Sequence, residues 1–271
     1  MTFNDAVDQS PNSRGQLLSK LPLITAGYWV VKICATTLGE TGADHLSMTL
    51  DWGYASSSLF FLSIFLLTLG VQLCSKKFNP LLYWLVFTSS SVTGTAVSDS
   101  MDRTLGLGYA KGSLVLALLL AVVLAAWYAV EKSLSVTRIR TRRGEIFYWM
   151  AFLIANTLGT ALGDFLADDS GLGFAGGAVL ISSLLAITLA AHYLTRISPI
   201  VLFWIAFVLT RPFGATFGDL LTKTHGQGGL GLGTQGTSLV LLVLMAVALI
   251  GNEMYSRRSG SRRNATAEPS E

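Results

Sequence analysis

The stretch YWMAFLIANTLGTALGDFL, residues 148–166, is an apolar run that carries regularly spaced polar side chains and a late aspartate. Counting back from Asp164 in steps of four gives Thr160, Asn156 and Phe152. Steps of four keep residues on one face of a helix, so these positions form a stripe that is mostly polar. Because polar and charged groups are costly in lipid, we expect the stripe to face the interior of a helix bundle.

The pattern of this stretch occurs four times in the chain. In each copy an aromatic residue and a tryptophan begin the segment, and an aspartate follows fifteen positions after the tryptophan. Each aspartate is followed by a glycine-rich segment and a second apolar run, which together predict a two-helix repeat. The aspartates are Asp44, Asp99, Asp164 and Asp219, and the repeats span about residues 21–75, 76–131, 145–195 and 196–252.

The composition indicates an integral membrane protein. Of 271 residues, 51% are hydrophobic and only 13% are charged, and the mean hydropathy is +0.55. These values are too apolar for an ordinary soluble domain. We predict an all-α polytopic fold of eight transmembrane helices, arranged as four parallel two-helix repeats that are pseudo-fourfold or two-by-two. The predicted spans are residues 22–44, 53–74, 80–100, 110–130, 146–167, 172–194, 198–221 and 232–252.

Basic residues set the expected orientation. They concentrate before the first repeat, in the connections between one repeat and the next, and after the last repeat. By the positive-inside rule these parts face the cytoplasm, so we expect both termini there. This topology explains the basic residues without nucleic acid, so the lipid bilayer is the predicted partner. The predicted segments are an N-terminal tail without a secretory signal (1–20), a membrane domain (21–252) interrupted by a basic cytoplasmic linker (132–144), and a disordered C-terminal tail (253–271).

The stripes on the four odd-numbered helices supply the candidate site. Counting back from each aspartate predicts two sets of inward-facing residues. The candidate metal ligands are Glu40, Asp44, Asp99, Asp164 and Asp219, and the candidate path residues are Lys32, Thr36, Ser91, Thr95, Asn156, Thr160 and Arg211. A neighbouring stripe of small pairs favours close helix packing. These pairs are Gly39/Ala43, Gly94/Ser98, Gly159/Gly163 and Gly214/Gly218.

Each aspartate lies at the outward end of an outward-running helix, where the helix dipole is negative. A carboxylate is disfavoured there and needs a positive partner. Lys32, Arg211, protons or a bound cation are the candidates. Two bases against five acids leave a charge of about −3 at ordinary pKa values. Clustered carboxylates suit magnesium, manganese or calcium.

A structural interpretation stands beside the functional one. The aspartates could bond the backbone of their own outer turns, and the hydroxyl residues could link neighbouring helices. Lys32, Glu40 and Arg211 break the fourfold pattern, which favours function for these three, since intramembrane charges usually mark ion or substrate pathways.

From Tyr28 to Asn252 the chain resembles a family of bacterial inner-membrane proteins built from four copies of a repeat of unknown function. The family's units begin with an aromatic-Trp pair and end with Gly-Thr-x-x-Gly-Asp. Repeat three fits best, whereas repeat four has Ala215 in place of threonine and repeat two has Ser98 in place of glycine. The resemblance implies a bacterial inner-membrane location and a role in transport or metal resistance, which favours export.

We therefore expect transport of a small cation, a divalent metal, through a central acid-lined path. An anion or polar-solute transporter or channel is one alternative, with Lys32 and Arg211 as attracting groups. A non-transporting membrane scaffold or stress-associated protein is another. We expect no enzyme, because no nucleophile elbow or Ser/His/Asp arrangement occurs, and no resident cofactor, the divalent cation being the substrate.

Overall fold

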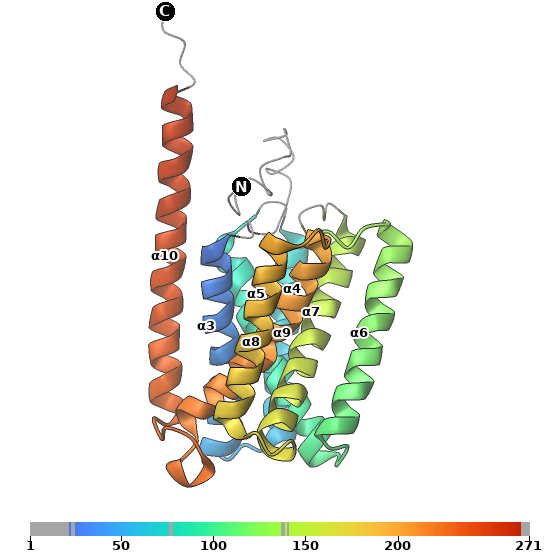
Figure 1. The fold of residues 1–271 in the computed structure, drawn as a ribbon, viewed down its shortest axis with the longest axis vertical. Coiled ribbons are helices and arrows are strands. Elements are labelled where there is room, and N and C mark those ends of the chain that lie inside the picture. The colour runs from blue at the N-terminus through green and yellow to red at the C-terminus, as the bar shows by residue number, and fades with distance from the viewer. Residues whose placement is uncertain (1–21, 23–24, 76–77, 137–138, 140, 267–271) are drawn as a thin grey trace, which may run out of the picture.

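A computed structural model describes residues 22, 25–75, 78–136, 139 and 141–266 (Figure 1). Within these residues the chain forms eight long α-helices and no β-strand. They are α3 (Ala26–Asp44), α4 (Tyr54–Cys74), α5 (Pro80–Asp99), α6 (Tyr109–Glu131), α7 (Arg142–Asp164), α8 (Gly173–Leu194), α9 (Pro199–Thr222) and α10 (Thr234–Thr266).

The sequence defines where the odd-numbered helices begin. A side-chain oxygen caps the first turn of α3, α5 and α7, and proline opens α5 and α9, where its missing N–H is not needed. The capping bonds are donated by Tyr28 N to Thr25 (3.3 Å), by Leu82 N to Asn79 (3.2 Å) and by Gly144 N to Thr141 (2.9 Å).

The first three repeats turn in the same way after the aspartate. One π-helical turn follows directly, as η1 (His45–Thr49), η2 (Ser100–Thr104) and η4 (Phe165–Asp169). Gly53 and Gly108, with φ of 75° and 76°, then immediately precede α4 and α6. Residues with a β-carbon rarely adopt this conformation, which explains the glycine-rich segments. In repeat four, α9 ends at Thr222 and the short helix η5 (His225–Gln227) follows.

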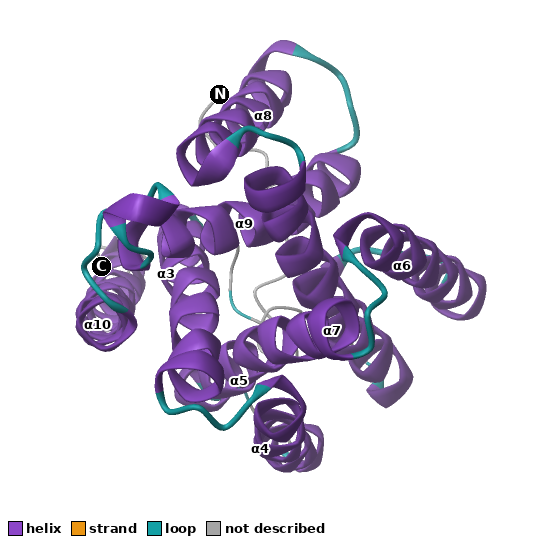
Figure 2. Cartoon of the chain, turned by 90° about the horizontal axis from the view of Figure 1, so that it is seen from below, coloured by secondary structure: helices purple, strands orange, loops and turns teal. Residues whose placement is uncertain are grey.

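The helices form an inner ring and an outer shell (Figure 2). Helices α3, α5, α7 and α9 pack side by side in a closed ring, with α9 returning to α3. Each outer helix packs on the inner helix of the next repeat: α4 on α5, α6 on α7, α8 on α9 and α10 on α3. The repeats thus enclose one axis with pseudo-fourfold symmetry, so the chain does not divide into two separate halves.

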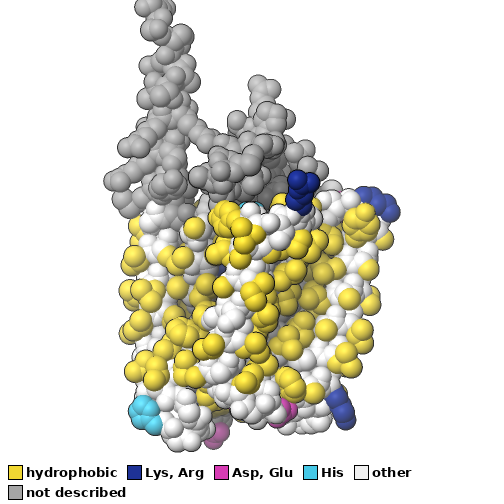
Figure 3. Space-filling model, viewed as in Figure 1, with side chains coloured by type: hydrophobic (Ala, Val, Ile, Leu, Met, Phe, Trp, Pro, Cys, Tyr) yellow, Lys and Arg dark blue, Asp and Glu magenta, His cyan; other side chains and the backbone are white. Residues whose placement is uncertain are grey.

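The outer shell has an apolar surface (Figure 3). Within the described residues, six helices are long and apolar enough to cross a membrane: α4, α6, α7 with η4, α8, α9 and residues 234–251 of α10. Helices α3 and α5 are too polar to meet that criterion. Their polar stripes are buried in the ring, and the apolar helices α10 and α4 pack against them. The fold is that of a membrane protein.

Two segments differ from expectation. Helix α7 begins at Arg142, inside the segment 132–144 for which a linker was predicted. Helix α10 continues to Thr266, through most of the predicted disordered tail. That extension contains glutamate, methionine and arginine, which favour helices, and the sequence has no proline between Pro212 and Pro269. The predicted N-terminal tail (1–20) lies outside the described residues.

Candidate functional site

The predicted stripes meet on the axis of the inner ring. We call the following four layers the axial column, and every residue in it is at most 4% exposed. The layers run from the middle of the helices towards the aspartate ends. They are Lys32, Phe87, Phe152 and Phe207; Thr36, Ser91, Asn156 and Arg211; Glu40, Thr95, Thr160 and Ala215; and Asp44, Asp99, Asp164 and Asp219.

Arg211 shows most directly that the stripes converge. From α9, its Nη1 donates to the backbone oxygen of Thr36 on α3 at 3.0 Å. Its Nη2 lies 3.4 Å from Glu40 Oε2, donates to Thr160 Oγ1 on α7 at 2.8 Å, and also contacts Thr95 Oγ1 on α5. One guanidinium therefore reaches all three other inner helices. Its five N–H donors in a rigid fork suit this geometry, which a lysine could not reproduce.

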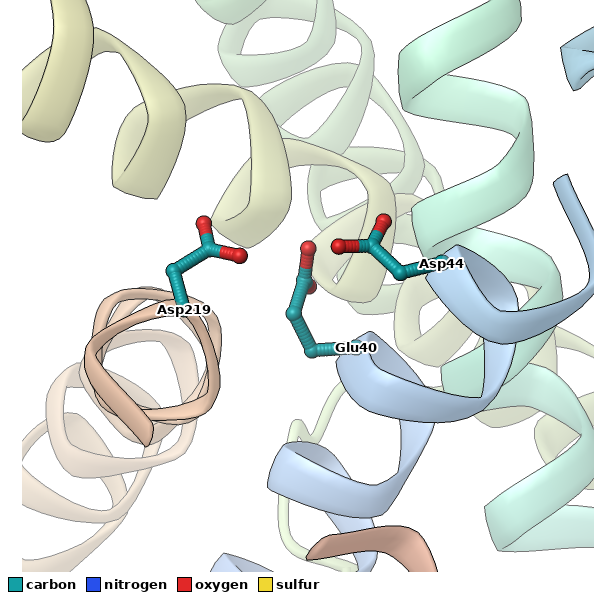
Figure 4. A group of neighbouring side chains, drawn as sticks. All are labelled: Glu40, Asp44 and Asp219. Atoms are coloured by element: carbon teal, nitrogen blue, oxygen red, sulfur yellow. The ribbon is translucent and has the colours of Figure 1, made fainter. Parts of the chain in front are cut away.

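Three of the five predicted metal ligands form a compact group, which we call the acid cluster: Glu40, Asp44 and Asp219. One carboxylate oxygen from each lies within 4.8 Å of the others, and the three side chains point towards one another from α3 and α9 (Figure 4). All three are buried. Oxygen ligands at this spacing have the chemistry that magnesium, manganese and calcium prefer.

A lysine joins the acid cluster. Lys223, the residue directly after α9, places Nζ 2.6 Å from Asp44 Oδ2 and 3.2 Å from Asp219 Oδ1. Burial disfavours the charged ammonium, but the carboxylates of Asp219 and Asp44 outweigh that effect and raise the pKa of Lys223 above its ordinary value. The arrangement therefore favours the charged form of Lys223.

The other two aspartates share an arginine. Arg103, in η2, places Nε 3.1 Å from Asp99 Oδ1 and Nη2 3.5 Å from Asp164 Oδ2. The second oxygen of Asp99 is buried and has no hydrogen-bond partner among the described residues. Asp99 and Asp164 thus lie in the same layer as the acid cluster's aspartates but form a separate pair.

These ion pairs correct the predicted charge balance. The sequence-based balance sets only Lys32 and Arg211 against five acids, because Arg103 and Lys223 fall in outer turns of the sequence. With all four bases on or beside the column, the charge is about −1 at ordinary pKa values, not −3. The missed residues had a sequence signal: each lies four positions after an aspartate, so the helical step continues into the turn.

Lys32 lies at the opposite end of the polar layers, in an aromatic ring. Its Nζ is 3.9 Å from the ring centre of Phe207, 5.2 Å from that of Phe87 and 5.6 Å from that of Phe152. It is fully buried and has no hydrogen-bond partner in the described part of the chain. The favourable contacts of its amino group are with the faces of these three aromatic rings. The layer closes the column on the side away from the aspartates.

Four positions before the members of the Lys32 layer, the inner helices carry three tyrosines and a phenylalanine. Tyr28, Tyr83 and Tyr148 occupy equivalent positions with Phe203, and the hydroxyls of Tyr83 and Tyr148 lie 2.8 Å apart. The sequence marks these aromatic residues as the starts of the repeats. Continuing the step of four from Lys32 also places them next to the Lys32 layer, on the side away from the aspartates.

The small stripes lie against the polar stripes of the next helix, which confirms their predicted packing role. A β-carbon added to the first glycine of each pair would overlap a side chain of the axial column. The pairings are Gly39 with Ser91, Gly94 with Asn156, Gly159 with Arg211 and Gly214 with Thr36. The glycines thus allow the inner helices to approach closely enough for Arg211 to reach across the ring.

Several of the predicted path residues link helices. Thr36 Oγ1 lies 3.0 Å from the oxygen of Ile33 in its own helix and 3.4 Å from that of Thr210. Asn156 Nδ2 donates to Ser90 Oγ at 3.3 Å. These bonds fit the structural interpretation of the neutral polar residues, whereas Thr95 and Thr160, in the Glu40 layer, contact the Arg211 guanidinium.

Fold and site together define the class as a helical membrane protein of four repeats with ionisable groups gathered on its axis. A family model described as Repeat of Unknown Function (DUF347) matches the chain at residues 27–78, 82–133, 147–198 and 202–257. The chain belongs to this family, which confirms the resemblance read from the aromatic-Trp and Gly-Asp motifs. No curated protein and no solved structure matches it.

Proposed function

We propose that this protein transports a small cation, a divalent metal, along the axis of its inner ring. The observation that carries the proposal is the acid cluster, three buried carboxylates whose oxygens converge within 4.8 Å inside an apolar shell. Ionisable groups in membrane-spanning segments are costly and usually serve an ion or substrate pathway.

The proposal includes eight membrane crossings. Helices α3 and α5 have 19 and 20 residues, so each is about 30 Å long, enough to span the hydrocarbon core. The basic residues favour cytoplasmic termini, which places the aspartate layer at the outer side. The location is a bacterial cytoplasmic membrane, and the direction is export.

The arrangement resembles an occluded site. The Lys32 layer lies on one side of the polar residues, and Arg103 and Lys223 lie on the other. A cation held by the acid cluster would be enclosed from both sides. Passage then requires the aromatic layer to part on the cytoplasmic side and the two bases to move on the outer side.

Flux into proteoliposomes tests the proposal. The purified protein is reconstituted and assayed with magnesium, manganese, calcium and zinc, and with an anion for comparison. We expect flux of at least one divalent cation, and loss of most of it in Glu40→Gln and Asp219→Asn. Asp164→Asn should reduce it as well, since this removes a charge from the same layer. Asp169→Asn, at an exposed site in η4, is the matched control. Normal flux in all three site variants would remove the acid cluster from the pathway.

A non-transporting membrane scaffold is the second candidate. The observation that favours it is internal pairing: Glu40 pairs with Arg211, Asp44 and Asp219 with Lys223, and Asp99 and Asp164 with Arg103. In a scaffold, the sole role of this network of ion pairs would be to hold the four inner helices together. The scaffold predicts no flux of any ion with a fully folded protein. The anion alternative is less favoured, because the Arg211 guanidinium is already bonded to protein oxygens.

A further inference from the structure

We propose that Lys223 and Arg103 are tethered counter-ions that occupy the carboxylate layer and leave it when a substrate cation binds. This inference rests on the proposed function and names how the same site is regulated. It makes binding an exchange, in which a mobile cation takes the place of a side chain that carries the same sign of charge.

The positions of the two bases support a paired device. Each lies four residues after the aspartate of its own repeat and also reaches the aspartate of the next repeat around the ring. Arg103 joins repeats two and three, and Lys223 joins repeats four and one. The equivalent positions in repeats one and three are Met48 and Asp168. The bases therefore follow a twofold pattern within the fourfold ring.

The ammonium of Lys223 lies where a cation would be bound. It is 2.6 Å from Asp44 and 3.2 Å from Asp219, two of the three members of the acid cluster. The Sδ of Met48 is a further neighbour at 3.7 Å. A divalent ion carries twice the charge of the ammonium in the same place, so the carboxylates attract it more strongly.

The carboxylate layer also has an unused ligand atom. Asp99 is only 2% exposed, and its Oδ2 has no hydrogen-bond partner among the described residues. A buried carboxylate oxygen without a partner is costly. We infer that Asp99 Oδ2 gains its missing partner when a cation binds in this layer or when the Arg103 side chain moves.

Both bases can reach solvent while the acids cannot. The side chains of Arg103 and Lys223 are 30% and 17% exposed, whereas those of the paired aspartates are 2–6% exposed. The backbone of Lys223 is held, because Gly231 N donates to its carbonyl at 2.8 Å and its own N donates to Asp219 O at 2.9 Å. Exchange therefore needs only rotation of flexible side chains. In an exporter, their return would displace the ion outwards.

Equilibrium binding of Mn²⁺ to the purified full-length protein in detergent tests the inference. Lys223→Met introduces the residue that repeat one already carries, at Met48. Because it removes a competing charge about 3 Å from the carboxylates, we expect Mn²⁺ affinity to rise at least about tenfold. Lys223→Arg keeps the charge, so its Mn²⁺ affinity should rise much less than that of Lys223→Met. Lys111→Met, which removes an exposed lysine at the start of α6, should stay within about twofold of wild type.

A second measurement uses the unmodified protein and does not depend on the folding of a variant. Amine-specific labelling followed by peptide mass spectrometry gives the reaction rate of Lys223 with and without Mn²⁺. We expect saturating Mn²⁺ to raise that rate several-fold, with Lys111 unchanged. Unaltered labelling of Lys223 at saturating Mn²⁺, or unaltered affinity in a folded Lys223→Met protein, would overturn the inference.

The outcomes separate the inference from the proposed function. Cation flux in wild type together with unchanged binding in Lys223→Met rejects the tethered counter-ion and keeps transport. Tighter Mn²⁺ binding in Lys223→Met without any flux in wild type keeps the exchange and rejects transport. Absence of both binding and flux rejects the two together.

Discussion

Gly159 on α7 lies so close to Arg211 on α9 that a β-carbon at residue 159 would overlap the Cβ and Cγ of the arginine. It would also lie 3.0 Å from Pro212 Cδ. Gly159→Ala should therefore destabilise the protein by about 1–3 kcal/mol, the usual cost of overpacking. Thermal unfolding in detergent measures this, with Gly70→Ala on the exposed face of α4 as the control, where no atom lies within 4 Å. Equal stability of the two variants would show that the ring accommodates the methyl group.

Arg211 and Glu40 should be energetically coupled. Arg211→Met leaves the Glu40 carboxylate buried without its cation, which should cost about 3–5 kcal/mol. Adding Glu40→Gln to that variant should restore part of the loss. A double-mutant cycle by chemical unfolding gives the coupling, expected to exceed about 1 kcal/mol. Additive effects of the two substitutions would mean that the pair does not stabilise the ring.

Lys32 should reduce stability and serve function. Its amino group is buried without a hydrogen-bond partner among the described residues, and a buried polar group left without a partner costs about 1–3 kcal/mol. Lys32→Met should therefore unfold at higher temperature than wild type. The same variant should lose most cation flux, if the charge controls passage through the aromatic layer. A less stable variant would indicate that cation–π attraction to Phe207 outweighs burial.

The two ends of α6 should be accessible from opposite sides of the membrane. Lys111 lies near its start, beside η2, and Lys132 directly follows its last residue. In a protein whose natural cysteines, Cys34 and Cys74, are replaced by serine, Lys111→Cys should react with an impermeant thiol reagent added outside intact cells. Lys132→Cys should react only after permeabilisation. The reverse pattern would invert the topology, and equal labelling of both sites would argue against a membrane-crossing α6.

Much of the fold could be predicted from periodicity. Four copies of one spacing, with polar residues every fourth position, predict inward-facing stripes on four inner helices but leave a single ring and a two-by-two arrangement both open. The structure contains the ring. The packing of each outer helix on the next repeat could not be predicted, because nothing in α4 distinguishes α5 from α3 as its partner.

The partners of the aspartates could be predicted only in part. The helix dipole indicates that Asp44 needs a positive neighbour, but Lys223 is 179 positions away and reaches it only because α9 closes the ring on α3. Arg103 has the same relation to Asp164 through the packing of α5 on α7. The four-residue step identifies both bases as candidates once it is continued past the aspartates.

Anomalous diffraction from Mn²⁺-soaked crystals tests the central claim most directly, since it locates the ion among named side chains. We predict a peak between the carboxylates of Glu40, Asp44 and Asp219, with the Lys223 ammonium moved out of contact with Asp44. Absence of a peak at the acid cluster, in crystals of a protein shown to bind Mn²⁺ in solution, would contradict the account.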